Sequence, residues 1–293
     1  MHDGLVVVDK PAGFTSHDVV AKLRKAYGQR RVGHAGTLDP DATGVLLVGL
    51  GRATRLLRFL QDTTKAYRGT IVFGVATDTL DAAGAVVEQQ PMLLARDEVE
   101  VATSAFLGEI EQLPPMVSAV QVGGRRLHEL ARAGEEVERR PRRVVVDRFD
   151  VEAFEPGAYP TATVLVECSS GTYVRALAAG LGAALGGCAH LRSLRRLRVG
   201  SFTLDEAHPL DVVCADPAAI VLTPAAAMRD LDRVVVDAEQ ARAVAHGMPF
   251  PAGALGATAP DALGPFAVVD DAGDLLAVYE RRGGAVKPAV VLA

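Results

Sequence analysis

Residues 33–44 hold the densest group of side chains that could do chemistry. The segment reads Gly-His-Ala-Gly-Thr-Leu-Asp-Pro-Asp-Ala-Thr-Gly and precedes an apolar run. A glycine-rich loop can hold a carboxylate in a fixed, crowded geometry, and Pro40 keeps Asp39 out of helical backbone space. An Asx turn followed by proline explains the same residues without any chemistry. From the residues alone, an active-site loop and a structural turn are about equally favoured.

Other catalytic templates fit less well. Residues 49–54 begin like a dinucleotide-binding loop but lack its third glycine. His34 and Asp39 could belong to a hydrolase triad, but no nucleophile elbow accompanies them. Asp78 and Asp81 are three positions apart in the sequence and could share a divalent metal ion. A pair of aspartates in a turn is more often structural.

A second polar segment, residues 168–175, reads Cys-Ser-Ser-Gly-Thr-Tyr-Val-Arg and joins an expected strand to an expected helix. Its Ser and Thr residues could cap that helix, whereas Tyr173 and Arg175 could reach a binding site. Cys168 ends an apolar strand, so we expect a buried thiol and not a nucleophile.

The elements that position these segments follow from hydrophobic periodicity and turn residues. Ser16 is expected to cap a helix over residues 17–27, and residues 33–44 are expected to form a loop. Further helices are expected over 52–60 and 174–185, and strands over 5–8, 45–50, 67–73, 144–154 and 161–168. Without a regular βαβ repeat, this pattern predicts a mixed α/β domain with a mainly antiparallel central sheet.

An Ala-, Asp- and Pro-rich stretch near residues 205–230 indicates a domain boundary. Beyond it we expect a helix over 238–246 and strands over 266–269, 275–279 and 289–292, the first two strands joined by a hairpin turn. The sequence therefore predicts a large domain over residues 1–225 and a small β-rich domain over residues 231–293.

The net charge of −5 comes entirely from residues 211–293, where 11 acidic residues face 6 basic ones. Residues 1–210 have no net charge but contain two clusters of basic residues, each with no acidic residue inside it. Such local patches, more than the net charge of the whole chain, attract a phosphate backbone. Each cluster alone could equally be a solvated surface. The first cluster is Lys22, Arg24, Lys25, Arg30 and Arg31; the second is Arg192, Arg195, Arg196 and Arg198.

Cysteine usage and the start of the chain indicate a cytoplasmic protein. Three cysteines without a CxxC pair argue against a disulfide framework or a structural zinc site. The first residues do not resemble a signal peptide, and no apolar run reaches membrane-spanning length. We therefore expect no association with a membrane.

Six segments in order resemble the tRNA pseudouridine synthase B family, TruB, of the bacterial type. They are VVVDKPAGFTSHDVV (6–20), GHAGTLDPDATGVL (33–46), KAY (65–67), DTLDAAG (78–84), CSSGTYVRALAAGLGAALG (168–186) and AHLRSLRRLRVGSF (189–202). The resemblance implies a pseudouridine synthase fold with a PUA-like RNA-binding domain over residues 231–293. It also implies that the protein isomerises uridine 55 in the T arm of tRNA, without metal or cofactor. We expect the protein to be a monomer.

The resemblance assigns roles residue by residue. Asp39 matches the catalytic aspartate, and Arg175 matches the arginine that pairs with this carboxylate. The positions that surround the target uridine are His34, Tyr67, Tyr173 and Leu194, and those with supporting roles are Lys10 and Asp81. Tyr67 is also expected to assist proton removal, and the uridine to be flipped out of its stack.

Two other functions remain to be compared with the synthase. One is a tRNA-binding or tRNA-folding protein of the same fold without catalysis, and intact Asp39, Tyr67 and Arg175 speak against it. The other is a metal-dependent nuclease that uses Asp78 and Asp81 and would lose its activity with a chelator.

Overall fold

A computed structural model describes residues 2–116, 121–122, 125–126, 137, 139–251, 253–255 and 264–292. The chain forms two compact units: Met1–Thr63 with Val199–Ala293, and Thr64–Arg198. The first unit is therefore built from both ends of the chain. In the described part of the chain, no α-helix combines the length and apolar composition that a membrane crossing requires.

A small sheet in the first unit carries the segment around Asp39. Strand β3 (Thr43–Leu50) pairs antiparallel with both β1 (Gly4–Lys10) and β2 (Val32–Ala35). The short β14 (His208–Pro209) pairs in parallel with β1. Successive side chains of a strand point to opposite faces, so Val6 and Val8 lie in one apolar cluster while Leu5 and Val7 lie in another.

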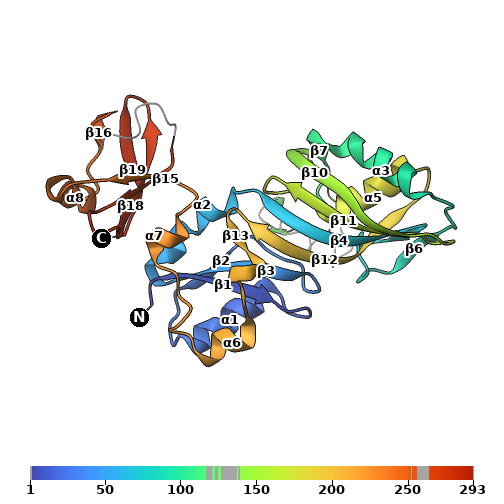
Figure 1. The fold of residues 1–293 in the computed structure, drawn as a ribbon, viewed down its shortest axis with the longest axis horizontal. Helices are drawn as coiled ribbons and strands as arrows, with labels where there is room; N and C mark the ends of the chain where they lie inside the picture. The colour runs from blue at the N-terminus through green and yellow to red at the C-terminus, as the bar shows by residue number, and fades with distance from the viewer. Residues whose placement is uncertain are drawn as a thin grey trace. The chain divides into compact units, whose positions relative to one another are not determined.

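Two helices cover the Val6 face of this sheet (Figure 1). They are α1 (Ser16–Ala26) and α6 (Leu210–Ala215), whose buried Val19, Leu23 and Val213 share a cluster with that face. The cap of α1 is Thr15, not Ser16 as expected: the Thr15 Oγ1 accepts from Asp18 N and the Asp18 carboxylate accepts from Thr15 N. Ser16 is the first helical residue and its side chain points into the protein, where it is 1% exposed.

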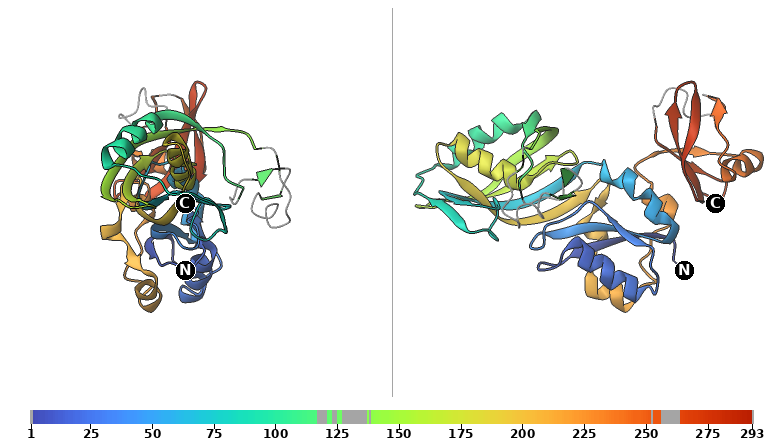
Figure 2. Two further views of the ribbon diagram at one scale, coloured as in Figure 1. Left: turned by 90° about the vertical axis from the view of Figure 1, so that its right-hand side faces the viewer. Right: turned by 180° about the vertical axis from the view of Figure 1, so that it is seen from behind.

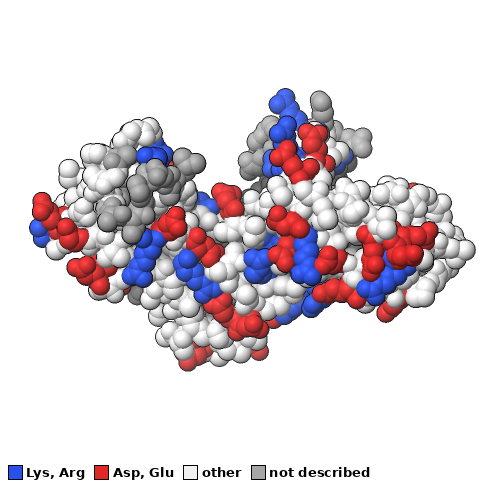
Figure 3. Space-filling view, turned by 45° about the horizontal axis from the view of Figure 1, so that its top comes forward, with Lys and Arg blue, Asp and Glu red and all other residues white. Residues whose placement is uncertain are grey.

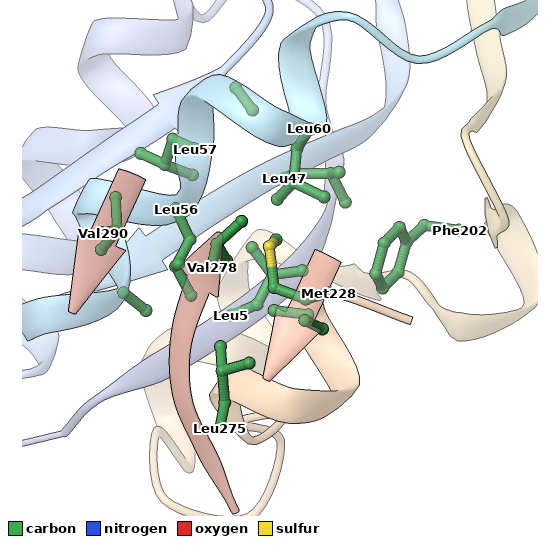
Figure 4. Packing of buried hydrophobic residues seen from close by; sticks show 14 of the residues in the cluster. Leu5, Leu47, Leu56, Leu57, Leu60, Phe202, Met228, Leu275, Val278 and Val290 are labelled. Atoms are coloured by element: carbon green, nitrogen blue, oxygen red, sulfur yellow. The ribbon is translucent and has the colours of Figure 1, made fainter. Parts of the chain in front are cut away.

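The C-terminal part of the first unit is a five-stranded sheet, which confirms the expected β-rich C-terminal domain. Its order is β15 (Asp232–Val235), β17 (Phe266–Val269), β18 (Leu275–Arg282), β19 (Ala285–Val291) and β16 (Phe250–Pro251). Helix α8 (Ala238–Ala245) packs on it through Val244. Figure 4 shows the cluster that contains Leu5. In it, Leu275, Val278 and Val290 of the C-terminal sheet pack with N-terminal residues that include Leu47 and Leu56.

Three arginines at one-turn intervals also bind the C-terminal sheet. They lie on η1 (Gly51–Leu56) and α2 (Leu57–Gln61), which replace the single helix expected over residues 52–60. The Arg52 guanidinium donates to the Leu292 carbonyl, Arg55 Nη1 donates to the Val291 carbonyl at 2.7 Å, and Arg58 pairs with Glu280 at 3.5 Å. Apolar packing and these bonds together attach the C-terminal sheet to the N-terminal segment.

The second unit is built on a long sheet of mainly antiparallel strands. Its order is β12 (Ala189–Val199), β4 (Lys65–Phe73), β11 (Thr161–Cys168), β10 (Arg142–Glu155) and β7 (Gly108–Gln112). Helices α3 (Arg96–Thr103) and α5 (Val174–Ala184) lie together on the same side of the sheet (Figure 2). The mixed α/β class with a mainly antiparallel sheet is confirmed.

Short elements complete the chain and correct some expectations. β2 and the first residues of β3 occupy part of the expected loop at 33–44, and β12 was not expected at all. The remaining elements are β5 (Val75–Thr77), β6 (Val86–Gln89), η2 (Ser104–Phe106), β8 (Gln121–Val122), β9 (Arg125–Arg126), β13 (Phe202–Thr203), η3 (Leu204–Glu206) and α7 (Pro224–Ala227).

Candidate active site

The backbone on both sides of Asp39 is held by buried side chains. Asp39 itself is half-buried, and its carbonyl accepts a hydrogen bond from Ala42 N at 3.1 Å. The Leu38 amide donates to Ser16 Oγ at 2.9 Å, and the Ser16 hydroxyl donates to the Leu38 carbonyl at 3.3 Å. The Pro40 carbonyl accepts from Lys10 Nζ at 2.8 Å. This loop is fixed well beyond what an isolated turn would require.

Lys10 is fully buried and its ammonium group is satisfied by backbone. Besides Pro40, it donates to the carbonyls of Pro11 at 2.9 Å and Phe14 at 2.6 Å. A buried charge needs such hydrogen bonds to offset its lost hydration. Lys10 therefore joins the turn after β1 to the loop of Asp39 through hydrogen bonds, and its supporting role in the reaction stays a prediction.

His34 lies on β2, opposite Val48 of β3, in the same unit as Asp39. Its ring makes an edge contact with the ring of His17 on α1, with centroids 5.2 Å apart. The first turn of α1 therefore contacts this segment twice, through Ser16 and through His17.

In the second unit, Arg175 and Asp81 form a nearly buried ion pair. Arg175, in the first turn of α5, donates from Nη1 to Asp81 Oδ2 at 3.0 Å and to the Thr79 carbonyl at 3.1 Å. The two side chains are 6% and 20% exposed. The other carboxylate oxygen of Asp81 accepts from Thr79 Oγ1 at 2.6 Å and Ala83 N at 3.1 Å. Hydrogen bonds from neighbouring groups therefore hold both side chains of the ion pair in one geometry.

Leu80, between Thr79 and Asp81, shows how strongly this turn is held. Its φ of 64° is the only positive value among the described non-glycine residues, and that region is costly for leucine. Two hydrogen bonds to the backbone of Leu191 and those of Arg175 retain the conformation. Strain of this kind is often found at functional sites.

Gly69 follows Tyr67 on the same face of β4 and lies against Leu191 and Leu194. Tyr67 is 9% exposed and pairs with Val166, so it shares the buried face of β4 and β11. Gly69 is the next residue on that face, and a Cβ there would lie 3.5 Å from Leu194 Cδ1 and 3.0 Å from Leu191 Cδ1. The missing side chain of Gly69 therefore leaves room for Leu191 and Leu194.

Tyr173 directly precedes the first residue of α5, and the side chain of Gln112 forms hydrogen bonds with both its amide and its carbonyl. The Tyr173 amide donates to Gln112 Oε1 at 2.9 Å, and Gln112 Nε2 donates to the Tyr173 carbonyl at 3.2 Å. Sequence reasoning missed Gln112, because a lone glutamine 61 positions away carries no local pattern.

Comparison with known proteins decides the family. The family model for "TruB family pseudouridylate synthase (N terminal domain)" matches residues 24–174. The tRNA pseudouridine synthase B of Rhodococcus jostii (strain RHA1) is 49% identical over 284 residues, which cover 96% of this chain and 90% of the relative. That of Thermobifida fusca (strain YX) is 46% identical over 100% of this chain and 99% of its own length.

The chain belongs to the TruB family of pseudouridylate synthases. Members of this family are isomerases that convert uridine to pseudouridine. Among solved structures, a chain in the crystal structure of a Cbf5-Nop10-Gar1 complex is 25% identical. It aligns with a TM-score of 0.76 over 99% of this chain and 85% of that one.

For a TruB-family enzyme, the nuclease and thiol alternatives lose their support. Asp78 Oδ1 accepts from Ala85 N at 2.9 Å, and Asp81 is engaged by Arg175, so both aspartates organise a turn. Cys168 is fully buried, and burial raises the pKa of its thiol to about 11. It is therefore protonated at neutral pH, as expected for a core residue.

The two basic clusters differ in how far their side chains are exposed and paired. Lys22, Lys25, Arg30 and Arg31 are exposed on α1 and the turn after it. In the second cluster Arg196 is 1% exposed, and Arg198 pairs with Glu167 of β11 at 2.6 Å. On the face displayed in Figure 3, basic and acidic side chains lie side by side without a large patch of one sign.

Proposed function

We propose that this TruB-family enzyme converts uridine 55 in the T arm of tRNA to pseudouridine, with Asp39 as its catalytic carboxylate. The observation that carries the proposal is the loop of Asp39, which is held on both sides by the buried Lys10 and Ser16. Relatives that match nearly the whole chain at 46–49% identity are named tRNA pseudouridine synthase B, which supports tRNA as the substrate.

In the proposed reaction the target uridine is flipped out of the stacked T arm. Tyr67 holds the free base on its ring face, and Leu194, His34 and Tyr173 line the base. The bond between N1 of uracil and C1′ of ribose breaks, and a bond between C5 and C1′ forms. The proton on C5 is removed and a proton is returned at N1. The product is an isomer of the substrate, so no group other than a proton is exchanged.

Charge assigns the remaining roles in the proposal. An aspartate is ionised at neutral pH unless its surroundings prevent this, so Asp39 can act as a nucleophile or a proton acceptor. We propose that Arg175 stabilises this carboxylate, as the resemblance implies, and that Asp81 holds the guanidinium in its geometry. The C-terminal sheet is proposed to be a PUA-like RNA-binding domain, and the enzyme to be a cytoplasmic monomer.

The test is incubation of the purified full-length chain with an unmodified tRNA transcript, followed by mapping of pseudouridine at each position. A second transcript with cytidine at position 55 is the matched control. The proposal expects one pseudouridine, at position 55 of the first transcript, with and without chelator. Binding without any pseudouridine would identify a non-catalytic tRNA-binding protein, and chelator-sensitive strand cleavage would identify a nuclease.

A further inference from the structure

The hydroxyl of Ser16 forms hydrogen bonds outside helix α1, and it is not needed to cap that helix. A serine at the start of a helix ordinarily caps it, but here Thr15 and Asp18 already form a complete capping box. The Ser16 side chain is 1% exposed and points away from its own helix. Both of its hydrogen bonds go to the backbone of Leu38, 22 positions away in the sequence.

These bonds fix the peptide that immediately precedes Asp39. The Leu38 carbonyl belongs to that peptide and accepts from the Ser16 hydroxyl at 3.3 Å. The following peptide is held at the Asp39 carbonyl by Ala42 N at 3.1 Å, and the Pro40 carbonyl is held by Lys10 at 2.8 Å. Rotation of the Asp39 backbone would therefore break at least one of these hydrogen bonds, and buried polar groups left unpaired are costly.

We infer that Ser16 is a positioning residue for Asp39. The inference rests on the proposed function, in which Asp39 must meet one atom of a flipped uridine. Reacting groups have to stand within a fraction of an ångström of their productive geometry, and a displacement of about 1 Å can lower a rate about 100-fold. Ser16 touches neither the base nor the carboxylate and acts only through the main chain of Leu38.

The experiment compares Ser16→Ala with Thr15→Ala in the full-length enzyme. Thr15→Ala removes the helix cap and leaves the bonds to Leu38, so it is a control for loss of helix stability alone. The single-turnover rate with a saturating unmodified tRNA transcript is measured, together with the Kd for that transcript. Both are measured at a temperature where circular dichroism shows every variant folded.

Ser16→Ala is expected to lower the saturated rate about 10- to 100-fold with little change in Kd. Thr15→Ala is expected to react like wild type, and Ser16→Thr, which retains the hydroxyl, to regain much of the rate. Ser16→Cys keeps the size of the side chain with a weaker donor, and replaces Ser16→Ala if that variant does not fold; its rate should lie clearly below wild type.

A saturated rate for Ser16→Ala equal to that of Thr15→Ala would overturn the inference, as would a wild-type rate for Ser16→Cys. A loss explained entirely by a higher Kd would overturn it too. Wild-type enzyme that forms no pseudouridine would contradict the proposed function instead. Active wild type, inactive Asp39→Asn and normal Ser16→Ala would contradict the positioning role alone.

Discussion

Tyr67 is placed so that its ring and its hydroxyl can be tested separately. The residue is 9% exposed and is the third residue of β4, with Val166 opposite and Gly69 next on the same face. Because β4 is paired with β11 from Lys65 to Val72, we expect exchange of this side chain to leave the sheet intact. In the proposed reaction the ring offers the flipped base an apolar surface, and the hydroxyl is a polar group near it.

Tyr67→Phe should bind tRNA well but lose most of its turnover, because the ring remains and the hydroxyl is gone. Tyr67→Leu should also weaken the hold on the flipped base, since stacking is worth about 1–3 kcal/mol per base. Single-turnover rates and Kd values for an unmodified tRNA separate the two effects. Wild-type turnover by both variants would show that Tyr67 is only a core residue.

Sequence reasoning assigned residues that have a local pattern and did not detect contacts between residues far apart in the sequence. Asp39 and Lys10 were assigned roles through the resemblance, and these roles stay predictions. The contacts of Ser16 with Leu38 and of Gln112 with Tyr173 span 22 and 61 positions. Only tertiary structure brings such partners together, and the same holds for the strain at Leu80.

One basic cluster lies on α1 and the turn after it and the other on β12, and the structure predicts different consequences for the two. Replacement of Arg30 and Arg31 by Gln should raise the Kd for tRNA and lower the log–log salt slope by about 0.7–0.9 per lost phosphate contact. Replacement of Arg195 and Arg198 should act in the same direction but less strongly, because Arg198 is held by Glu167. The saturated single-turnover rate should change little in either variant.

Salt titrations of tRNA binding for the two double variants check this prediction, with the exposed Arg143 and Arg96, which belong to neither cluster, as a control pair. An unchanged slope together with a lower melting temperature would assign the arginines to stability. Their aliphatic stems would then act by packing on the core.

Elements with a strong period were predicted well. The helix over 17–27 is α1 to within one residue at each end, and the strand over 161–168 matches β11, whose buried face alternates strictly. β12 was missed because its four arginines obscure any alternation, one of them being buried. β2 was missed because it is four residues long and begins in a glycine-rich stretch. Both segments are strands because they pair with neighbouring strands in the folded chain, and local sequence preference does not reveal this.

At the scale of the whole molecule, the C-terminal sheet and the N-terminal segment share one apolar cluster (Figure 4). The acidic C-terminal part therefore shares a core with the segment that carries Asp39, a relationship that sequence periodicity could not reveal. Leu56, 1% exposed, lies in this cluster together with Leu5 of β1 and Val278 of β18.

Leu56→Ala should lower the free energy of unfolding by about 2–5 kcal/mol, because it leaves a cavity in a packed core. Hydrogen exchange should show reduced protection in β1 and in β18 together. Val235→Ala on β15 is the control: this side chain is 51% exposed, and such surface changes stay within about 0.5 kcal/mol. Reduced protection in β18 alone would show that the two parts unfold independently.

The most direct test of the central claim is pseudouridine formation by Asp39→Asn, compared with Asp41→Asn. Both aspartates lie in the same loop, both changes remove one charge and little volume, and Asp41 is exposed. The enzymes are incubated with an unmodified tRNA transcript, and Kd and single-turnover product are measured. Asp39→Asn is predicted to bind the transcript with near-normal affinity and form no pseudouridine, whereas Asp41→Asn reacts like wild type. Near-normal pseudouridine formation by pure Asp39→Asn would contradict the assignment of Asp39 as the catalytic carboxylate.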